Sequence, residues 1–194
     1  HTGIQILGAG VEISGLEISA FAAGIHILNC SPGIYGNIVT HFAIAGIQID
    51  AKSGDANPEI VNNLIYTEDR VFFRDESIQR ALAGPKGAVA ISVNPNGYKT
   101  SPKIHHNTLY GCASCAGMTA DTGIFINDSA GGGTNGISDI QFNIIHNFSG
   151  YGIYNNASTG GNYVIDYNCI NNPSATDDFY QAAKGANGLA ADPG

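Results

Sequence analysis

The sequence predicts an all-β solenoid in which about six coils of short strands surround one aliphatic core. Two short phrases alternate along the chain and recur through most of its 194 residues, as an array of equivalent coils requires. Glycine contributes 26 residues, and its backbone freedom suits the tight corners between short strands. Hydrophobic residues make up 43% of the chain and charged residues 12%, which indicates a single ordered domain over residues 1–194.

The first phrase is a glycine followed by alternating aliphatic residues. It reads GIQI at Gly3, GIHI at Gly24, GIQI at Gly46, GAVAI at Gly87, GIFI at Gly123 and GIY at Gly152. Such alternation predicts a strand with one buried face and one outward face. The predicted outward positions, one on each coil, are Gln5, His26, Gln48, Ala90, Phe125 and Tyr154.

The second phrase places a polar residue between aliphatic residues at a bend. It reads ISGLEI from Ile13, IYGNIV from Ile34, IVNNLI from Ile60, IHHNTL from Ile104, IQFNII from Ile140 and IDYNCI from Ile165. Its fixed central position is Leu16, Asn37, Asn63, Asn107, Asn143 and Asn168. Because an asparagine at a corner can bond both the backbone and the asparagine of the next coil, these positions predict an asparagine ladder.

Together the two phrases resemble those of the right-handed parallel β-helix superfamily, the pectate-lyase-like fold, over essentially the whole chain. The tail DYNCINNPSATDDFYQAAKGANGLAADPG is also similar to the final strand region of secreted bacterial β-helix proteins, whose chains continue past the Asp-Pro pair. The resemblance implies a right-handed β-helix from a secreted or cell-surface bacterial protein, of which these residues are one part. The superfamily includes polysaccharide lyases, hydrolases, epimerases, phage tailspikes and adhesins, so the fold does not select an activity.

Charge and hydropathy argue against two classes of partner. The chain carries 16 acidic and 8 basic residues, and its net charge of −8 repels the phosphates of nucleic acids. No apolar run approaches the length of a membrane span. We therefore expect no nucleic-acid ligand and no transmembrane segment.

Insertions lengthen the middle coils. Residues 50–58 and 94–102 lengthen one corner, residues 66–86 and 110–122 lengthen another, and stacking should place each pair side by side. In the longest insertion, Asp75 as N-cap and Gly84 as stop predict a short helix near 75–83. Seven of the eight bases and six acids lie between residues 52 and 103, a mixture that favours a sugar-binding cleft there.

The insertion also supplies candidate groups for polysaccharide cleavage. Elimination in a uronan needs a base for the sugar C5 proton and a cation to neutralise the carboxylate. Arg70 or Arg74 is the candidate base. Glu68, Asp69 or Asp121 is a candidate ligand for calcium, which binds through oxygen.

Hydrolysis would instead need two carboxylates flanking one glycosidic bond, and Asp69 and Asp75 are the candidates. The same two acids could simply pair with Arg70 and Arg74 to hold the inserted helix in place. The Asp-His and Arg-x-Pro-x-x-Arg patterns of pectate lyases are absent from the chain. An enzyme of this sequence, whether lyase or glycoside hydrolase, would use a different constellation.

Polysaccharide is the expected partner, and Gln48, Tyr66, Phe125 and Tyr154 are the candidate substrate-binding residues. Phe125 and Tyr154 fall on consecutive coils, where two rings could form a platform for sugar rings. The alternative is a non-catalytic structural or adhesive solenoid, whose open ends stack on further coils or on another subunit.

The four cysteines do not form a disulfide framework. Cys30 and Cys169 lie in the second and sixth coils, too far apart for a bond, and we expect a corner thiol at Cys30 and a small core residue at Cys169. Cys112 and Cys115 could close a small loop, which is weak support for metal or redox chemistry.

Overall fold

The computed structural model describes residues 1–67, 88–112, 121–127, 136, 138–156, 163–172 and 177–180. Within these ranges the chain forms strands and no helix, and the predicted helix near 75–83 lies outside them. The strands are β1 (Thr2–Ile6), β2 (Glu12–Ser14), β3 (Glu17–Ser19), β4 (Ala23–Leu28), β5 (Gly33–Tyr35), β6 (Ile38–Thr40), β7 (Ala45–Asp50), β8 (Glu59–Val61), β9 (Leu64–Tyr66), β10 (Val89–Asn94), β11 (Lys103–His105), β12 (Thr108–Tyr110), β13 (Thr122–Ile126), β14 (Ser138–Gln141), β15 (Ile144–His146), β16 (Tyr151–Asn155), β17 (Tyr163–Asp166), β18 (Cys169–Asn171) and β19 (Asp177–Tyr180).

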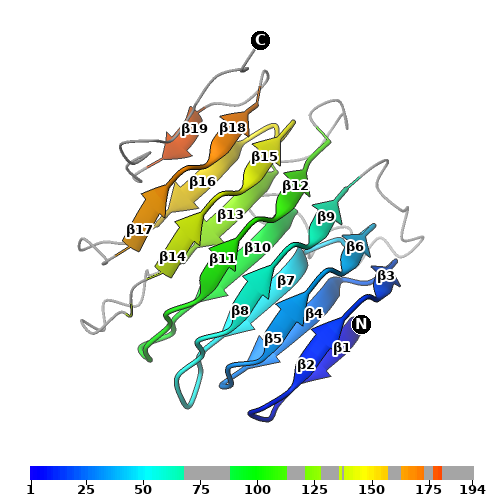
Figure 1. Cartoon of the computed structure of the whole chain (residues 1–194), viewed down its shortest axis with the longest axis vertical. Coiled ribbons are helices and arrows are strands. Elements are labelled where there is room, and N and C mark those ends of the chain that lie inside the picture. The colour runs from blue at the N-terminus through cyan, green and yellow to red at the C-terminus, as the bar shows by residue number, and fades with distance from the viewer. Residues whose placement is uncertain are drawn as a thin grey trace.

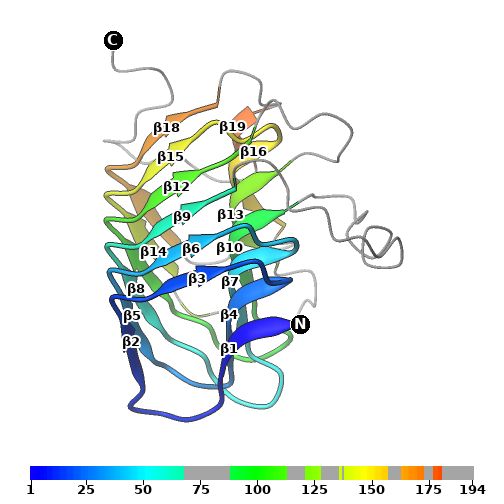
Figure 2. The ribbon, with the colours of Figure 1, turned by 90° about the vertical axis from the view of Figure 1, so that its right-hand side faces the viewer.

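These strands form three parallel sheets, which the chain visits in turn (Figure 1). Sheet A has the order β1-β4-β7-β10-β13-β16-β19, sheet B the order β2-β5-β8-β11-β14-β17, and sheet C the order β3-β6-β9-β12-β15-β18. We call one passage through sheets A, B and C a coil, so that β7, β8 and β9 make up the third coil. Figure 2 shows the strands of sheet C one above another along the molecule. The predicted all-β, parallel, solenoid-like arrangement is confirmed.

The core is a column of aliphatic side chains that fills the space between the three sheets. In the third coil, Ile47 and Ile49 from sheet A, Ile60 from sheet B and Ile65 from sheet C are all 0% exposed. Register brings the equivalent residues of successive coils into contact, as in the pairing of Ile47 with Ile91 and of Ile60 with Ile104. Burial of the inward alternate residues explains why strands of three to six residues are stable here.

A row of asparagine side chains runs along the corner between sheets B and C. The Oδ1 atom of Asn107 accepts hydrogen bonds from the backbone N–H and the side-chain amide of Asn63, both at 3.0 Å. Its own amide donates to the carbonyl of Ile60 at 2.9 Å and to Oδ1 of Asn143 at 3.1 Å. The same contacts link Asn37 to Asn63 and Asn143 to Asn168. We call Asn37, Asn63, Asn107, Asn143 and Asn168 the asparagine row, and it satisfies backbone groups that the corner would otherwise bury unpaired.

The residue before each asparagine-row position, and the residue before Leu16 in the first coil, adopts a left-handed backbone. In the early coils this residue is Gly15, Gly36 or Asn62, which tolerate a positive φ at low cost. In the later coils it is His106 (φ 56°), Phe142 (φ 57°) or Tyr167 (φ 54°). Their rings stack with centroid separations of 5.0 Å and 4.9 Å, which offsets part of the backbone strain.

Two predictions about the coils need correction. Val89 pairs with Ala45 and Ile91 with Ile47, so Ala90, not Gly87, stands at the position that Gly46 holds in the third coil. Ala90 is 0% exposed and does not face outward.

Of the two free cysteines in the described residues, Cys169 differs from its prediction, because it is half-buried on the outward side of β18 and not in the core. Cys30 lies in the corner between β4 and β5, as predicted, and it is buried there with its thiol donating to the carbonyl of Ile6. Burial raises the pKa of the Cys30 thiol. Cys112 is disulfide-bonded, and Cys115 lies outside the described residues.

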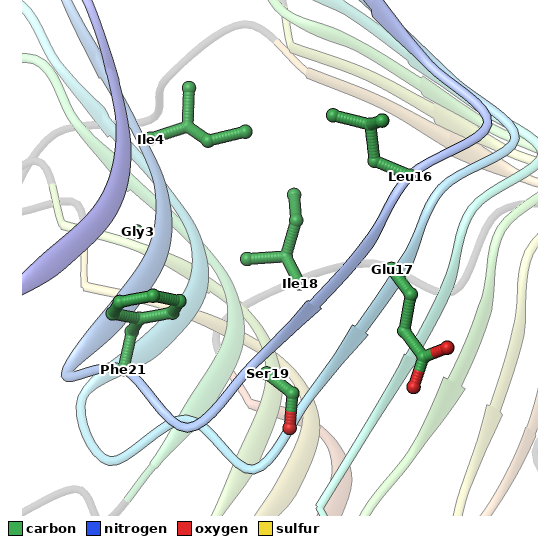
Figure 3. A pocket seen from close by; sticks show the side chains of 7 residues that line it. All are labelled: Gly3, Ile4, Leu16, Glu17, Ile18, Ser19 and Phe21. Atoms are coloured by element: carbon green, nitrogen blue, oxygen red, sulfur yellow. The ribbon is translucent and has the colours of Figure 1, made fainter.

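The first coil contains a pocket with apolar side chains in its lining. This pocket of about 550 Å³ lies between β1 and β3, the first strands of sheets A and C. Ile4, Leu16 and Ile18 point into this pocket, while the carboxylate of Glu17 extends away from it (Figure 3). Leu16 has no side-chain amide, and its backbone N–H donates to Oδ1 of Asn37 at 3.1 Å, where the asparagine row begins.

Candidate binding face of sheet A

The outward face of sheet A carries one residue of each coil in a continuous row. Strand pairing aligns Gln5 with His26, His26 with Gln48, Gln48 with Ser92, Ser92 with Phe125, and Phe125 with Tyr154. Five of these residues lie between two inward aliphatic positions of their strands, as Gln48 does between Ile47 and Ile49, and Tyr154 lies between Ile153 and Asn155. We call this set the sheet A row. Its predicted members are confirmed except that Ser92 takes the place assigned to Ala90.

Asp50, the last residue of β7, is the centre of the polar end of this face. Its Oδ2 atom lies 2.9 Å from Nε2 of His26 and 3.3 Å from Nζ of Lys52, and it accepts a 3.0 Å hydrogen bond from Nε2 of Gln48. Its Oδ1 atom accepts a 2.9 Å bond from the amide of Asn94. The carboxylate therefore joins four side chains from three neighbouring coils and fixes their orientation.

The surroundings of Asp50 also set its protonation state. Burial of the carboxyl favours the neutral form, but the hydrogen bonds from His26 and Gln48 and the charge of Lys52 outweigh burial, so the pKa of Asp50 lies below its ordinary value. Asp50 is thus ionised at neutral pH. A carboxylate held in this way organises its neighbours and is not available as a general acid.

Asp50 also begins a second polar row, which the sequence reasoning missed. The amide of Asn127 donates to Oδ1 of Asn94, and the amide of Asn156 donates to Oδ1 of Asn127, both at 3.3 Å. The signal was present in the sequence for three of them, because Asp50, Asn127 and Asn156 lie four positions after Gly46, Gly123 and Gly152. These polar residues follow the last aliphatic residue of the first phrase and so lie just outside its repeated pattern.

The other end of the sheet A row is aromatic. The rings of Phe125 and Tyr154 pack with their centroids 5.4 Å apart, and Tyr151 approaches Tyr154 at 4.8 Å. Phe125 is only 7% exposed, so the half-buried ring of Tyr154 is the more accessible of the two. Gln5, His26 and Gln48 are the accessible members at the polar end, since Ser92 is 8% exposed.

The stacked insertions at the first corner lie beside this polar end. Ala56 pairs with Thr100, the N–H of Lys99 donates to Oδ1 of Asp55, and the N–H of Ser101 donates to Oδ1 of Asn57. The predicted side-by-side placement of residues 50–58 and 94–102 is therefore confirmed. Lys52 in the first of these loops carries its ammonium group back to Asp50.

Of the remaining predicted residues, the two that the structure describes, Tyr66 and Asp121, do not join the sheet A row. Tyr66 ends β9 in sheet C, where its ring meets that of His41 edge to face at 6.4 Å. Asp121 is 1% exposed, and its carboxylate accepts a 3.0 Å hydrogen bond from the N–H of Ala88. The candidates Glu68, Asp69, Arg70, Arg74 and Asp75 lie outside the described residues.

The described part of the chain contains no group of three or more His, Cys, Asp or Glu side chains that could hold a metal ion. No helix among the same residues is long and apolar enough to cross a membrane. Searches of protein-family models, of curated proteins and of solved structures returned no match to this chain.

Proposed function

We propose that this chain is an extracellular right-handed parallel β-helix, related to the pectate-lyase-like superfamily, that binds a polysaccharide along the outward face of sheet A. The right-handed sense follows the strong preference of crossovers between parallel strands. The asparagine row is then the ladder of such a helix. A secreted bacterial origin and the polysaccharide partner are part of this proposal.

The observation that carries the proposal is the sheet A row, which presents one side chain per coil at a spacing of about 4.8 Å. Its polar end offers the amides of Gln5 and Gln48 and the imidazole of His26, and its other end offers the ring of Tyr154. Amides bind sugar hydroxyls as donors and acceptors, and an aromatic ring packs against the apolar face of a sugar. A polymer suits such a row because the coils present their contacts at regular intervals along one line.

Asp50 holds neighbouring polar side chains in fixed orientations, and this favours binding of a ligand to them. His26, Gln48 and Asn94 are all held by this carboxylate, so they lose little conformational entropy when a ligand binds. Because these donors occupy the carboxylate, we assign binding, and no bond cleavage, to Asp50 and the side chains that it holds. A lyase reaction would draw its base from Arg70 or Arg74 and its calcium ligands from Glu68 and Asp121.

A structural or adhesive solenoid is the second candidate function. The regular stacking of strands in the three parallel sheets favours it, because an array of equivalent coils is a typical structural scaffold.

One experiment separates the two functions. The protein is titrated with a panel of acidic and neutral polysaccharides, with and without calcium, by affinity electrophoresis and calorimetry, while unsaturated-uronate absorbance and new reducing ends are followed. Saturable binding to one polymer class supports the proposal, and products would add cleavage to it. Absence of binding across the panel would contradict the proposal and favour the structural solenoid.

A further inference from the structure

The strands of sheet A bring acidic but no basic side chains to the proposed binding face. Within the described residues, these strands contain no Lys or Arg. Their acids are Asp50, Asp177 and Asp178. The six members of the sheet A row carry no formal charge, apart from His26 when its imidazole is protonated. In sheet B, by contrast, Lys103 pairs with Glu59 on one side and Asp139 on the other.

Lys52 brings a positive charge to the polar end of this face, and Asp50 neutralises it. The ammonium group lies 3.3 Å from Oδ2 of Asp50, a carboxylate whose side chain is itself buried. In the insertion stacked on this one, Lys99 donates its backbone N–H to Oδ1 of Asp55. Asp50 and Asp55 therefore balance Lys52 and Lys99, and residues 50–58 and 94–102 together have no net formal charge.

This balance of charge bears on the kind of polymer that the face can bind. A uronate carboxylate loses water when it binds, and it needs a cation or several donors in exchange. The described part of the face offers no excess of positive charge, and the net charge of −8 of the whole chain repels an acidic polymer. A neutral sugar meets neither of these costs.

We propose that the sheet A row binds a neutral polysaccharide, whose sugars carry hydroxyl groups and no carboxylate or sulfate groups. This inference rests on the proposed function and names the class of polymer. The amides of Gln5 and Gln48 each contain donors and an acceptor, which match the two roles of a hydroxyl. Tyr154 offers a ring to the apolar face of a sugar, a contact that needs no charge. Asp50 then sets the specificity, because its carboxylate neutralises Lys52.

The test compares polymers that differ in charge and little in size. Xylan, mannan, galactan and a β-glucan are each prepared as a hydroxyethyl and as a carboxymethyl derivative of equal substitution, and polygalacturonate and alginate are added as natural acidic polymers. The affinity of the whole chain is measured by calorimetry at about pH 8, in about 20 mM and 500 mM salt, with and without calcium.

We expect binding to at least one hydroxyethyl polymer, with an affinity about tenfold or more above that for its carboxymethyl partner. Salt should change the affinity for the neutral polymer by less than about twofold, because no ion pair forms. Tighter binding to an acidic polymer, with or without calcium, would overturn this inference and leave the proposed polysaccharide binding standing. Absence of binding to every polymer would overturn both.

Asp50→Asn tests whether Asp50 sets the selectivity, because it removes the charge that neutralises Lys52. The substitution should reduce the preference for the neutral member of the pair by about fivefold in low salt, and high salt should remove the change. Far-UV circular dichroism checks that the variant keeps its fold. A preference that stays unchanged in Asp50→Asn would overturn the role of Asp50.

Asp139→Asn is the matched control on sheet B. Its carboxylate also accepts a hydrogen bond from a glutamine of its own strand, Gln141 at 2.8 Å, and lies 3.1 Å from Nε2 of a histidine in the next coil, His105. The substitution changes the net charge of the chain by the same amount as Asp50→Asn. It should leave the preference for the neutral polymer unchanged. An equal change in both variants would mean that overall charge sets the preference, and would overturn the role of Asp50.

Discussion

A Cβ atom on Gly46 would lie 2.5 Å from Cγ2 of Ile65, the inward residue of sheet C in the same coil. Gly24 has the same relation to Cγ1 of Val39, at 2.5 Å, and Gly123 to Cγ2 of Ile145, at 2.6 Å. A β-branched residue on sheet C thus excludes any side chain at the first-phrase glycine.

The fourth coil supports this steric account, because both positions change together. Ala90 replaces the glycine, and Leu109 replaces the β-branched residue that Ile65 and Ile145 supply on either side. Leucine has no branch at Cβ, so it leaves room where isoleucine places Cγ2. Both Ala90 and Leu109 are 0% exposed.

Gly46→Ala should therefore destabilise the protein by about 1–3 kcal/mol through overpacking. Ile65→Leu in the same chain should recover part of that loss, because it recreates the Ala90 and Leu109 combination. Urea unfolding of the two single variants and the double variant measures the coupling. Strictly additive effects would contradict the steric pairing of Gly46 with Ile65. The double variant should still be less stable than the unaltered chain, because the new Cβ atom would also lie 2.8 Å from the carbonyl oxygen of Ala90.

Asn107→Leu should cost about 4 kcal/mol of unfolding free energy, because it leaves the N–H of Asn63 and the carbonyl of Ile60 unpaired inside the protein. The matched variant is Leu16→Asn, which adds an amide at the end of the asparagine row, where Leu16 is 43% exposed. It should change stability by less than about 1 kcal/mol. Equal effects of the two substitutions in urea titrations would show that the row does not stabilise the corner.

Asp50→Asn should reveal a pH-dependent contribution of the Asp50 carboxylate. Its pKa is lower in the folded protein than in the unfolded chain, so its stabilisation is present above the unfolded pKa of about 3.9 and is lost as the pH falls through the folded pKa. We expect a deficit of about 2 kcal/mol at pH 7 that shrinks below about pH 4. Unfolding curves at pH 7, 5 and 3 would argue against this role if the deficit stayed constant.

Much of the fold could be predicted from the sequence, because solenoid coils repeat the same local physics. Each Ile of the first phrase and each Asn of the second meets its equivalent one coil away, so one correct alignment fixes the others. The error at Ala90 shows the limit of that reasoning. Gly87 matches the glycine of the first phrase in the sequence. Ala90 takes the glycine position in the fold, and Leu109, two strands later in the chain, leaves room for its side chain.

The site was less predictable than the core, since outward residues are not constrained by the repeat. Strand alternation located Gln48, Phe125 and Tyr154 in one row, but it could not show that Asp50 gathers His26, Gln48 and Asn94 from three coils. Tyr66 illustrates the other difficulty. Its place in the same coil as Gln48 predicts a shared site, yet Tyr66 lies on sheet C and Gln48 on sheet A.

Two glutamine variants distinguish polysaccharide binding by the sheet A row from binding elsewhere on the protein. Gln48 on sheet A donates to Asp50 at 3.0 Å, and Gln141 on sheet B donates to Asp139 at 2.8 Å, so the two are alike in burial and in partner. The affinity of each alanine variant for the polysaccharide that the unaltered chain binds is measured by calorimetry. We expect Gln48→Ala to weaken binding by about tenfold or more and Gln141→Ala to leave it unchanged. Full affinity in Gln48→Ala, or an equal loss in both variants, would contradict the account.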